Sequence, residues 1–178
     1  MNGGENDLWG VQILQLLRSQ QRSLVLAESC TAGLISAMLA RIPGMSECLC
    51  GGFVVYQTVS KQVWLGVSPD LIVTHDVVSG EVAAAMASGA LAQTPHADLA
   101  LAITGHLGPG APAELDGTAW LAITDRAGKK LVLQLQLTRD DHAAGTALRQ
   151  QRQRQSATLA LQHLLEFLAD TCDPGEGP

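Results

Sequence analysis

The sequence predicts an α/β fold, a single three-layer domain in which one mixed β-sheet is covered by helices on both faces. Hydrophobic residues make up 47% of the 178 residues and aromatic residues only 3%, so the core must consist mostly of aliphatic side chains, which pack well in helix-on-sheet layers. Segments with apolar residues at helical spacing alternate with short apolar runs typical of buried strands. No internal repeat or linker interrupts this alternation. Residues 1–172 are therefore expected to form one domain, and residues 173–178 a disordered tail.

Apolar patterning predicts the element order α-β-α-β-α-α-β-β-β-α. The predicted elements are a helix over 8–19, a strand over 23–27, a helix through 34–39 that ends at Pro43-Gly44, a strand over 49–56, a short helix over 60–66, a helix over 80–93, strands over 98–104, 118–124 and 130–137, and a long helix from about 143 to 169.

Local signals set several boundaries of these elements. Ser29 or Thr31 is expected to cap the helix that follows the first strand, and Ser79 to cap the helix over 80–93. Gly66 and Pro69 should stop the short helix before them. The connection over 125–129 is short enough for an antiparallel hairpin.

Charge and composition exclude several classes of partner. The formal charge is -6, and no long basic stripe precedes the C-terminal segment, which argues against nucleic acid as a partner. The first seven residues lack the basic and apolar regions of a signal peptide, and no apolar run is long enough to span a membrane. We therefore expect a cytoplasmic protein that binds neither nucleic acid nor membrane.

The four cysteines do not form a recognisable metal or disulfide pattern. Cys30, Cys48, Cys50 and Cys172 show no C-x-x-C spacing and have no neighbouring histidine cluster. We therefore predict no metal site. Cys48 and Cys50 alternate along a predicted strand, which is more typical of small core residues than of a redox pair.

The turn after the first predicted strand holds three candidate nucleophiles, Ser29, Cys30 and Thr31. They lie at the start of a helix, where free backbone N–H groups can bind an anion or stabilise an oxyanion. Helix capping is an equally good explanation for the hydroxyl groups. The local sequence leaves both interpretations open.

A base for such a nucleophile is harder to choose from the sequence. None of the five histidines lies in a recognisable triad context, and we expect each on the surface or in a loop. Of the three lysines, Lys129 and Lys130 occupy a hairpin turn, which leaves Lys61 in a mostly apolar neighbourhood. A desolvated lysine can serve as a base, although position alone favours a solvated one.

Two further features remain open at this stage. Tyr56, the only tyrosine, ends a predicted strand five residues before Lys61 and could be simply a half-buried aromatic residue. The segment 105–117 is rich in Gly and Pro and must be a loop between strands. It holds no lysine, so it is not a Walker A loop.

Several motifs in one order resemble the family of the C-terminal domain of the competence/damage-inducible protein CinA, which includes stand-alone nicotinamide-nucleotide amidases. The resemblance covers nearly the whole chain. It rests on Ala27-Glu28-Ser29-Cys30-Thr31-Ala32-Gly33, Pro43-Gly44-Met45-Ser46, Gly52-Phe53-Val54-Val55-Tyr56 followed by Lys61, Leu65-Gly66-Val67, Val78-Ser79, Ile103-Thr104-Gly105 with Gly108-Pro109, and Gly117-Thr118.

The resemblance implies a metal-independent amidohydrolase, without a cofactor, that converts nicotinamide mononucleotide to nicotinic acid mononucleotide and ammonia in pyridine nucleotide salvage. Ser29 resembles the family's attacking hydroxyl, Lys61 its general base, and Tyr56 a residue that orients the network or shuttles a proton. A homo-oligomer is also implied.

The resemblance further suggests which residues bind the substrate. Backbone N–H groups after Ser29 would meet the oxyanion or the substrate phosphate, and a glycine beside the pocket would let the ligand approach closely. Of the arginines in the last helix, Arg149 is the preferred phosphate ligand, whereas Arg152 and Arg154 fit a solvated basic face at least as well. The predicted substrate-binding residues are Cys30, Thr31, Gly33, Ser46, Thr104, Gly105 and Arg149.

The 105–117 loop departs from the family pattern. It is shorter, and it lacks the Lys-Pro pair that the family has before the Gly-Thr matched here by Gly117-Thr118. This departure motivates two alternatives to the predicted activity. One is a catalytically silent module of the same fold that senses a nucleotide, and the other is an amidase with a changed substrate.

Overall fold

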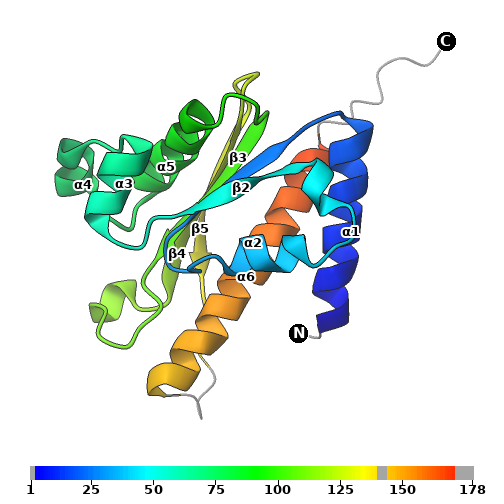
Figure 1. The fold of residues 1–178 in the computed structure, drawn as a ribbon. Helices are drawn as coiled ribbons and strands as arrows, with labels where there is room; N and C mark the ends of the chain where they lie inside the picture. The colour runs from blue at the N-terminus through cyan, green and yellow to red at the C-terminus, as the bar shows by residue number, and fades with distance from the viewer. Residues whose placement is uncertain (1–2, 140–143, 171–178) are drawn as a thin grey trace.

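A computed structural model describes residues 3–139 and 144–170, and it shows one five-stranded sheet with helices on both faces (Figure 1). The α/β fold class predicted from the sequence is confirmed. The strands are β1 (Leu24–Glu28), β2 (Leu49–Val54), β3 (Leu99–Gly105), β4 (Thr118–Asp125) and β5 (Lys130–Gln136). The helices are α1 (Gly3–Ser19), α2 (Leu34–Ala40), α3 (Thr58–Leu65), α4 (Pro69–His75), α5 (Gly80–Gln93) and α6 (Gly145–Ala169), with short 3₁₀ turns η1 (Met45–Glu47) and η2 (Ala113–Leu115).

The sheet is mixed, with strand order β2-β1-β3-β4-β5. β1 lies parallel to both β2 and β3, whereas β3, β4 and β5 are antiparallel neighbours. The last residue of β1, Glu28, lies opposite Val54 of β2 and Ile103 of β3. The carboxyl ends of three strands therefore meet at one edge of the sheet, which is where α/β sheets commonly bind ligands.

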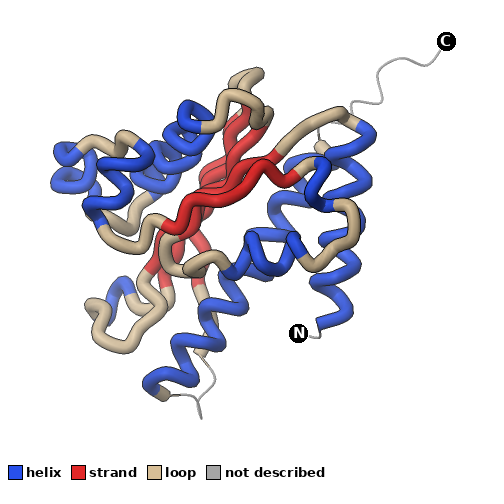
Figure 2. The backbone as a smooth tube through the Cα atoms, in the orientation of Figure 1, coloured by secondary structure: helices blue, strands red, loops and turns tan. Residues whose placement is uncertain are grey.

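Helices cover both faces of the sheet (Figures 1 and 2), and the alternating side chains of β1 divide the core into two layers. Leu24 and Leu26 of β1 pack with α1, α2 and α6 on one face, and Val25 and Ala27 pack with α3 and α5 on the other. The second layer is rich in alanine, so α5 can lie close to the sheet.

One glycine fixes the position of α3 against α5. A Cβ on Gly89 of α5 would lie only 2.0 Å from the carbonyl oxygen of Leu65, the last residue of α3. The two helices can approach this closely because Gly89 has no side chain. This contact brings the end of α3 close to the backbone of α5.

One prediction about a helix stop and one about a helix cap were confirmed, whereas one cap was wrong and one helix was missed. α3 ends at Leu65 with Gly66 as its left-handed C-cap, as expected. Pro69, however, begins α4, a helix absent from the predicted order; its fixed φ suits the first turn and its missing N–H costs nothing there. Neither Ser29 nor Thr31 caps α2, whose N-cap residue is Gly33 and has no side-chain bond of its own. Ser79 does cap α5, because its hydroxyl accepts a hydrogen bond from the Val82 amide.

None of the helices in the described part of the chain is long and apolar enough to cross a membrane. The tail predicted for residues 173–178 lies outside the described residues.

Candidate active site

The turn after β1 is organised by the carboxylate of Glu28, which is fully buried. Its Oε2 accepts hydrogen bonds from the amides of Gly33 (3.1 Å) and Ile35 (3.0 Å), and its Oε1 accepts from the amide and the hydroxyl of Ser36 (2.8 and 2.7 Å). A buried carboxylate with four donors is well compensated, and its negative charge also suits the start of a helix. Glu28 therefore caps α2 from the end of the strand, a role that the sequence analysis missed.

Ser29 leaves the sheet directly at this turn. Its amide donates to the carbonyl of Ile103 on β3 at 3.0 Å, which continues the parallel ladder by one residue. Two left-handed residues, Ala32 (φ 53°) and Gly33 (φ 91°), then reverse the chain into α2. Ser29 is consequently held by β3 on one side and by the Glu28 cap on the other.

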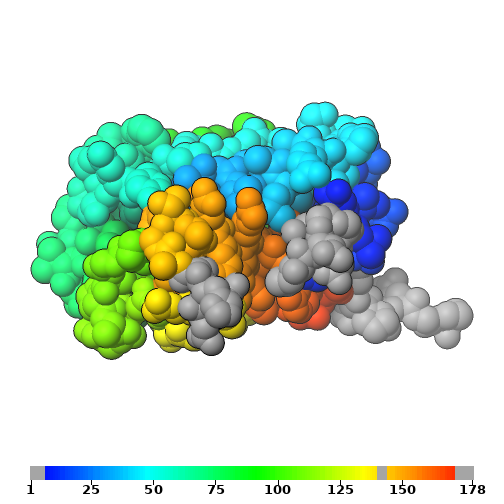
Figure 3. All heavy atoms as spheres, turned by 90° about the horizontal axis from the view of Figure 1, so that it is seen from below, coloured from blue at the N-terminus to red at the C-terminus, as the bar shows by residue number. Residues whose placement is uncertain are grey.

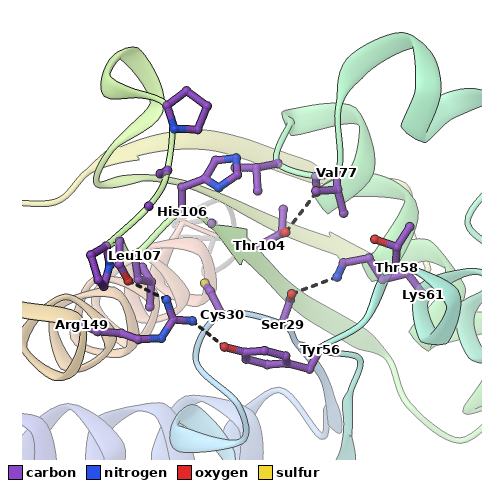
Figure 4. Close-up of a pocket in the computed structure, with 17 residues that line it drawn as sticks. Ser29, Cys30, Tyr56, Thr58, Lys61, Val77, Thr104, His106, Leu107 and Arg149 are labelled. Carbon is purple, nitrogen blue, oxygen red and sulfur yellow. Dashed lines mark hydrogen bonds between the residues drawn. The ribbon is translucent and has the colours of Figure 1, made fainter. Parts of the chain in front are cut away.

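Lys61 reaches Ser29 from α3. Its ammonium nitrogen Nζ donates to Ser29 Oγ at 2.9 Å and to the Val55 carbonyl at 2.9 Å (Figure 4). The residue is only 1% exposed, so the expectation of a solvated lysine was wrong. Burial lowers the pKa of Lys61 from the usual lysine value, because desolvation disfavours the ammonium form.

The structure distinguishes the three hydroxyl and thiol groups of the turn. Burial raises the pKa of Cys30 to about 12, so its thiol stays protonated and is a poor nucleophile at neutral pH. Thr31 is fully buried, and its Oγ1 has no hydrogen-bond partner among the described residues. Ser29 is the member of the trio whose side chain is bonded to Lys61.

Tyr56 and Arg149 form a second pair beside the first. The Tyr56 hydroxyl accepts a short hydrogen bond from Arg149 Nη2, and Arg149 Nη1 donates to the Gly108 carbonyl at 2.8 Å. Figure 4 shows the Tyr56 hydroxyl turned toward Arg149 rather than toward Lys61. Tyr56 is 53% exposed, so it borders the site instead of being enclosed by it.

A pocket of about 310 Å³ opens between these two pairs. It lies at the carboxyl ends of β1 and β3 and is bounded by the 105–117 loop and the first turns of α6. Of the residues predicted from the sequence, seven line it: Ser29, Cys30, Tyr56, Lys61, Thr104, Gly105 and Arg149.

Thr104 and Gly105 line the pocket but also have structural tasks. The Thr104 hydroxyl donates to the Val77 carbonyl at 3.1 Å and so ties the segment before α5 to β3. A Cβ on Gly105 would lie 2.7 Å from the Cβ of Ala119 on β4. The close approach at Gly105 is therefore to the neighbouring strand, whereas the sequence analysis expected it to be to a ligand.

The structure does not bring three predicted residues to this pocket. Thr31 is fully buried and does not line the pocket, and Gly33 donates its amide to Glu28. Ser46 is exposed in η1, just before β2, whose first residue Leu49 pairs with the first residue of β1. It therefore lies at the opposite end of the sheet from Ser29, a separation that strand direction imposes and that a sequence motif does not reveal.

Other residues of the pocket wall were missed. Thr58, Val77, Val78 and the stretch 106–112 all line it. His106 was expected to be an ordinary loop residue, yet it lies on the wall and its Nε2 is buried without a partner among the described residues. Its position three residues after the last apolar residue of β3 was the one available signal.

Arg152 also differs from its prediction. We expected a solvated basic face, but the Arg152 side chain is buried and pairs with Asp116 of the loop. Arg154 is exposed, as predicted. Figure 3 shows the first turns of α6, in orange, lying directly against the 105–117 loop, in green.

The residues described by the structure contain no group of three or more His, Cys, Asp or Glu side chains placed to hold a metal ion.

Comparison with known proteins places this arrangement in a family. The model of the CinA C-terminal domain matches residues 9–168. The chain belongs to the CinA C-terminal domain family. The resemblance inferred from the sequence motifs is thereby confirmed.

Relatives of this CinA domain include longer proteins. A CinA-like protein from Syntrophotalea carbinolica is 38% identical over 169 residues, which cover 94% of this chain and 38% of that protein. A CinA-like protein from Myxococcus xanthus is 39% identical over 124 residues, which cover 68% of this chain and 29% of that protein. The chain therefore spans about a third of the length of these curated relatives.

Solved structures match the CinA domain over almost its whole length. A CinA superfamily protein from Klebsiella pneumoniae superposes with a TM-score of 0.84 at 26% identity, covering 96% of this chain and 99% of that one. A competence/damage inducible protein from Agrobacterium tumefaciens gives a TM-score of 0.83 at 30% identity, covering 95% and 97%.

Proposed function

We propose that this domain is an amidase that hydrolyses the carboxamide of nicotinamide mononucleotide to nicotinic acid mononucleotide and ammonia. The observation that carries the proposal is the 2.9 Å contact between Ser29 Oγ and the buried Lys61 Nζ on the wall of the pocket. A nucleophile in contact with a desolvated amine is the arrangement that Ser/Lys hydrolysis requires. The choice of substrate rests on the resemblance to the amidases of the family.

In the first half of the reaction, Ser29 is the nucleophile and Lys61 the base. Neutral Lys61 takes the proton from Ser29 Oγ as that oxygen attacks the carboxamide carbon, which forms a tetrahedral intermediate. The Lys61 ammonium then returns the proton to the leaving nitrogen. The C–N bond breaks, ammonia departs, and the nicotinoyl group stays on Ser29 as an ester.

In the second half, water replaces ammonia. Lys61 takes a proton from the water, whose oxygen attacks the ester carbon, and then returns that proton to Ser29 Oγ as the C–O bond breaks. The product forms as a carboxylic acid, which loses its proton to solvent and leaves as a carboxylate, and Ser29 and Lys61 regain their starting protonation states.

The oxyanion of each intermediate needs hydrogen-bond donors. Within residues 29–36, the amides of Ser29 and of residues 32–36 already donate to other described atoms. The amide of Cys30, which lines the pocket directly after the nucleophile, remains as the candidate donor. A backbone amide in this position would stabilise the developing charge without reorganisation.

Arg149 is the candidate for the substrate phosphate. It lines the pocket, and its bonds to Gly108 and Tyr56 use two of the five donors of its guanidinium. The remaining donors suit the two-bond recognition of a phosphate. Tyr56 would then orient Arg149 as well as border the pocket.

The test is ammonia release from nicotinamide mononucleotide by the purified protein. Ser29→Ala and Lys61→Ala are each expected to lower kcat by about 10³-fold or more, while circular dichroism stays unchanged. Ser68→Ala and Lys130→Ala, which alter an exposed hydroxyl and an exposed ammonium away from the pocket, serve as matched controls and should keep wild-type rates.

Two results would replace the proposal with an alternative. Tight binding of the nucleotide in calorimetry without ammonia release would indicate a sensing module. Ammonia release from another amide-bearing nucleotide, but not from nicotinamide mononucleotide, would indicate an amidase with a changed substrate.

A further inference from the structure

An ion pair with a buried guanidinium and a partly exposed carboxylate fastens the 105–117 loop to α6. Arg152 Nη1 and Nη2 donate to Asp116 Oδ1 and Oδ2 at 2.7 and 2.8 Å, which is the parallel two-bond geometry. Nη1 also lies 3.5 Å from the Leu107 carbonyl, at the other end of the loop. The Arg152 side chain is 3% exposed, whereas that of Asp116 is 31% exposed. The loop thus covers the guanidinium from the solvent side.

Both ends of the loop pack directly onto this pair. A Cβ on Gly108 would lie 2.8 Å from Asp116 Oδ1 and 3.0 Å from Arg152 Nη1, and one on Gly117 would lie 3.1 Å from Arg152 Nη2. Both glycines also have left-handed φ values, 63° and 79°. The backbone therefore bends around the guanidinium at two points where a side chain would collide with it.

The segment between these two points forms one wall of the pocket. Residues 107–112 line it, although neither Arg152 nor Asp116 does. One turn earlier on α6, Arg149 binds the carbonyl of Gly108 at 2.8 Å. The position of this wall relative to Arg149 and Ser29 thus depends on the ion pair beneath it.

Stability alone does not explain the pair. Burying a guanidinium costs much of what its partner returns, and apolar side chains in the same place often stabilise a fold equally well. The two-bond geometry does supply a fixed distance and direction between α6 and the loop.

We propose that Arg152 and Asp116 are positioning residues that hold the 105–117 loop as a closed wall of the substrate pocket and so set the affinity for the nucleotide. The identity of the ligand rests on the proposed function, but the role of the ion pair in holding the loop does not depend on it. The role is exerted through the loop, since neither side chain reaches the pocket.

The test uses the double variant Arg152→Met/Asp116→Asn, which removes both charges and leaves no unpaired ion in the interior. Arg22→Met/Asp125→Asn is the matched control: that pair spans 2.8 Å, has side chains 16% and 6% exposed, and lies at the opposite end of the sheet. Hydrogen exchange of amides 105–117 and the kinetics of nicotinamide mononucleotide hydrolysis are measured on both double variants and on the wild type.

We expect exchange in the loop of the first variant to accelerate by about tenfold or more while the amides of β1 and β3 keep their protection. KM should rise about tenfold with kcat changed by less than about twofold, because the loop contacts the substrate but takes no part in the chemical step. The control should leave both loop exchange and KM unchanged.

Wild-type exchange in the loop, or a wild-type KM despite accelerated exchange, would overturn the proposal, as would a loss confined to kcat. If the wild-type protein releases no ammonia, the proposed function fails, and loop exchange together with calorimetric binding of the same nucleotide still decides the role of the pair.

Discussion

The two sides of the pocket are held in different ways. On one side, Ser29 and Lys61 are anchored by the sheet, by the Glu28 cap and by backbone carbonyls, and both are buried. On the other side, the 105–117 loop is joined to the sheet by backbone hydrogen bonds of His106 and Gly117 at its base, and above the base two arginines of α6 hold it. The Ser29–Lys61 side of the pocket is therefore part of the protein core, whereas the 105–117 loop is attached to the surface of that core.

This difference separates chemistry from recognition. A change in the loop moves the wall that meets the substrate but leaves the Ser29–Lys61 contact in place, because no hydrogen bond of that pair comes from the loop. The departure of the loop from the family pattern therefore bears on which substrate fits more than on whether an amide can be cleaved. Substitutions on each side of the pocket test this separation.

The largest effect is expected at the catalytic side. Lys61→Met retains the length and apolar stem of the side chain but removes the base, so kcat should fall by about 10³-fold or more with KM nearly unchanged. Steady-state ammonia release measures both constants. A fall in kcat/KM that came mainly from KM would contradict the assignment of Lys61 to chemistry and would break the comparison between the two sides.

The next effect concerns the cap that supports Ser29. Glu28→Gln places an amide donor against amides that already donate, and loss of the charge-assisted bonds should lower the free energy of unfolding by about 2–3 kcal/mol. Urea unfolding measures this. The control Glu47→Gln, whose partner Arg18 is exposed, should cost less than about 1 kcal/mol. If both variants lowered the free energy of unfolding equally, the buried Glu28 cap would stabilise the protein no more than an exposed ion pair does.

The extent to which each side could be predicted follows the same division. Ser79 was identified as the cap of α5 because its partner, Val82, is three residues away. The Glu28 cap was missed because a carboxylate at the end of a strand is not a standard capping position, although its partners are only five to eight residues ahead. Short-range chemistry is readable from the sequence when it follows a known local pattern.

The features that were not predicted depend on residues that lie far apart in the sequence. Arg152 was taken for a solvated residue because its partner, Asp116, lies 36 residues away on the chain. Ser46 was placed in the site by its motif, but strand direction puts it at the far end of the sheet. The strand order itself could not be read from the pattern, whereas the antiparallel hairpin of β4 and β5 could, because its connection is short.

The pH dependence offers a smaller but sharper test of Lys61. The reaction needs the neutral amine, so kcat/KM should rise about tenfold per pH unit at low pH and level off at the pKa of Lys61, below the ordinary lysine value of about 10.4. The folded state binds fewer protons than the unfolded state between these two pKa values. Stability should therefore rise with pH across that window.

Lys61→Met provides the control for the stability part. Without the buried amine, the free energy of unfolding should lose this rise while keeping the other pH dependence of the wild type. Urea titrations of both proteins over the same pH range measure the difference. Parallel curves would show that Lys61 does not lose its proton more readily in the folded state.

The smallest effect is expected for Tyr56→Phe, which removes only the hydroxyl bound to Arg149. Because that hydroxyl is turned away from Lys61 and lies beside solvent, we expect Tyr56 to act on the recognition side, by orienting Arg149 (Figure 4). KM should rise about threefold with little change in kcat, as for loss of one exposed hydrogen bond. A proton shuttle would instead require kcat to fall by about 10²-fold or more and the pH profile to change shape. That result would assign Tyr56 to the catalytic side together with Ser29 and Lys61. Arg149, which binds both Tyr56 and the loop, would then connect the two sides of the pocket.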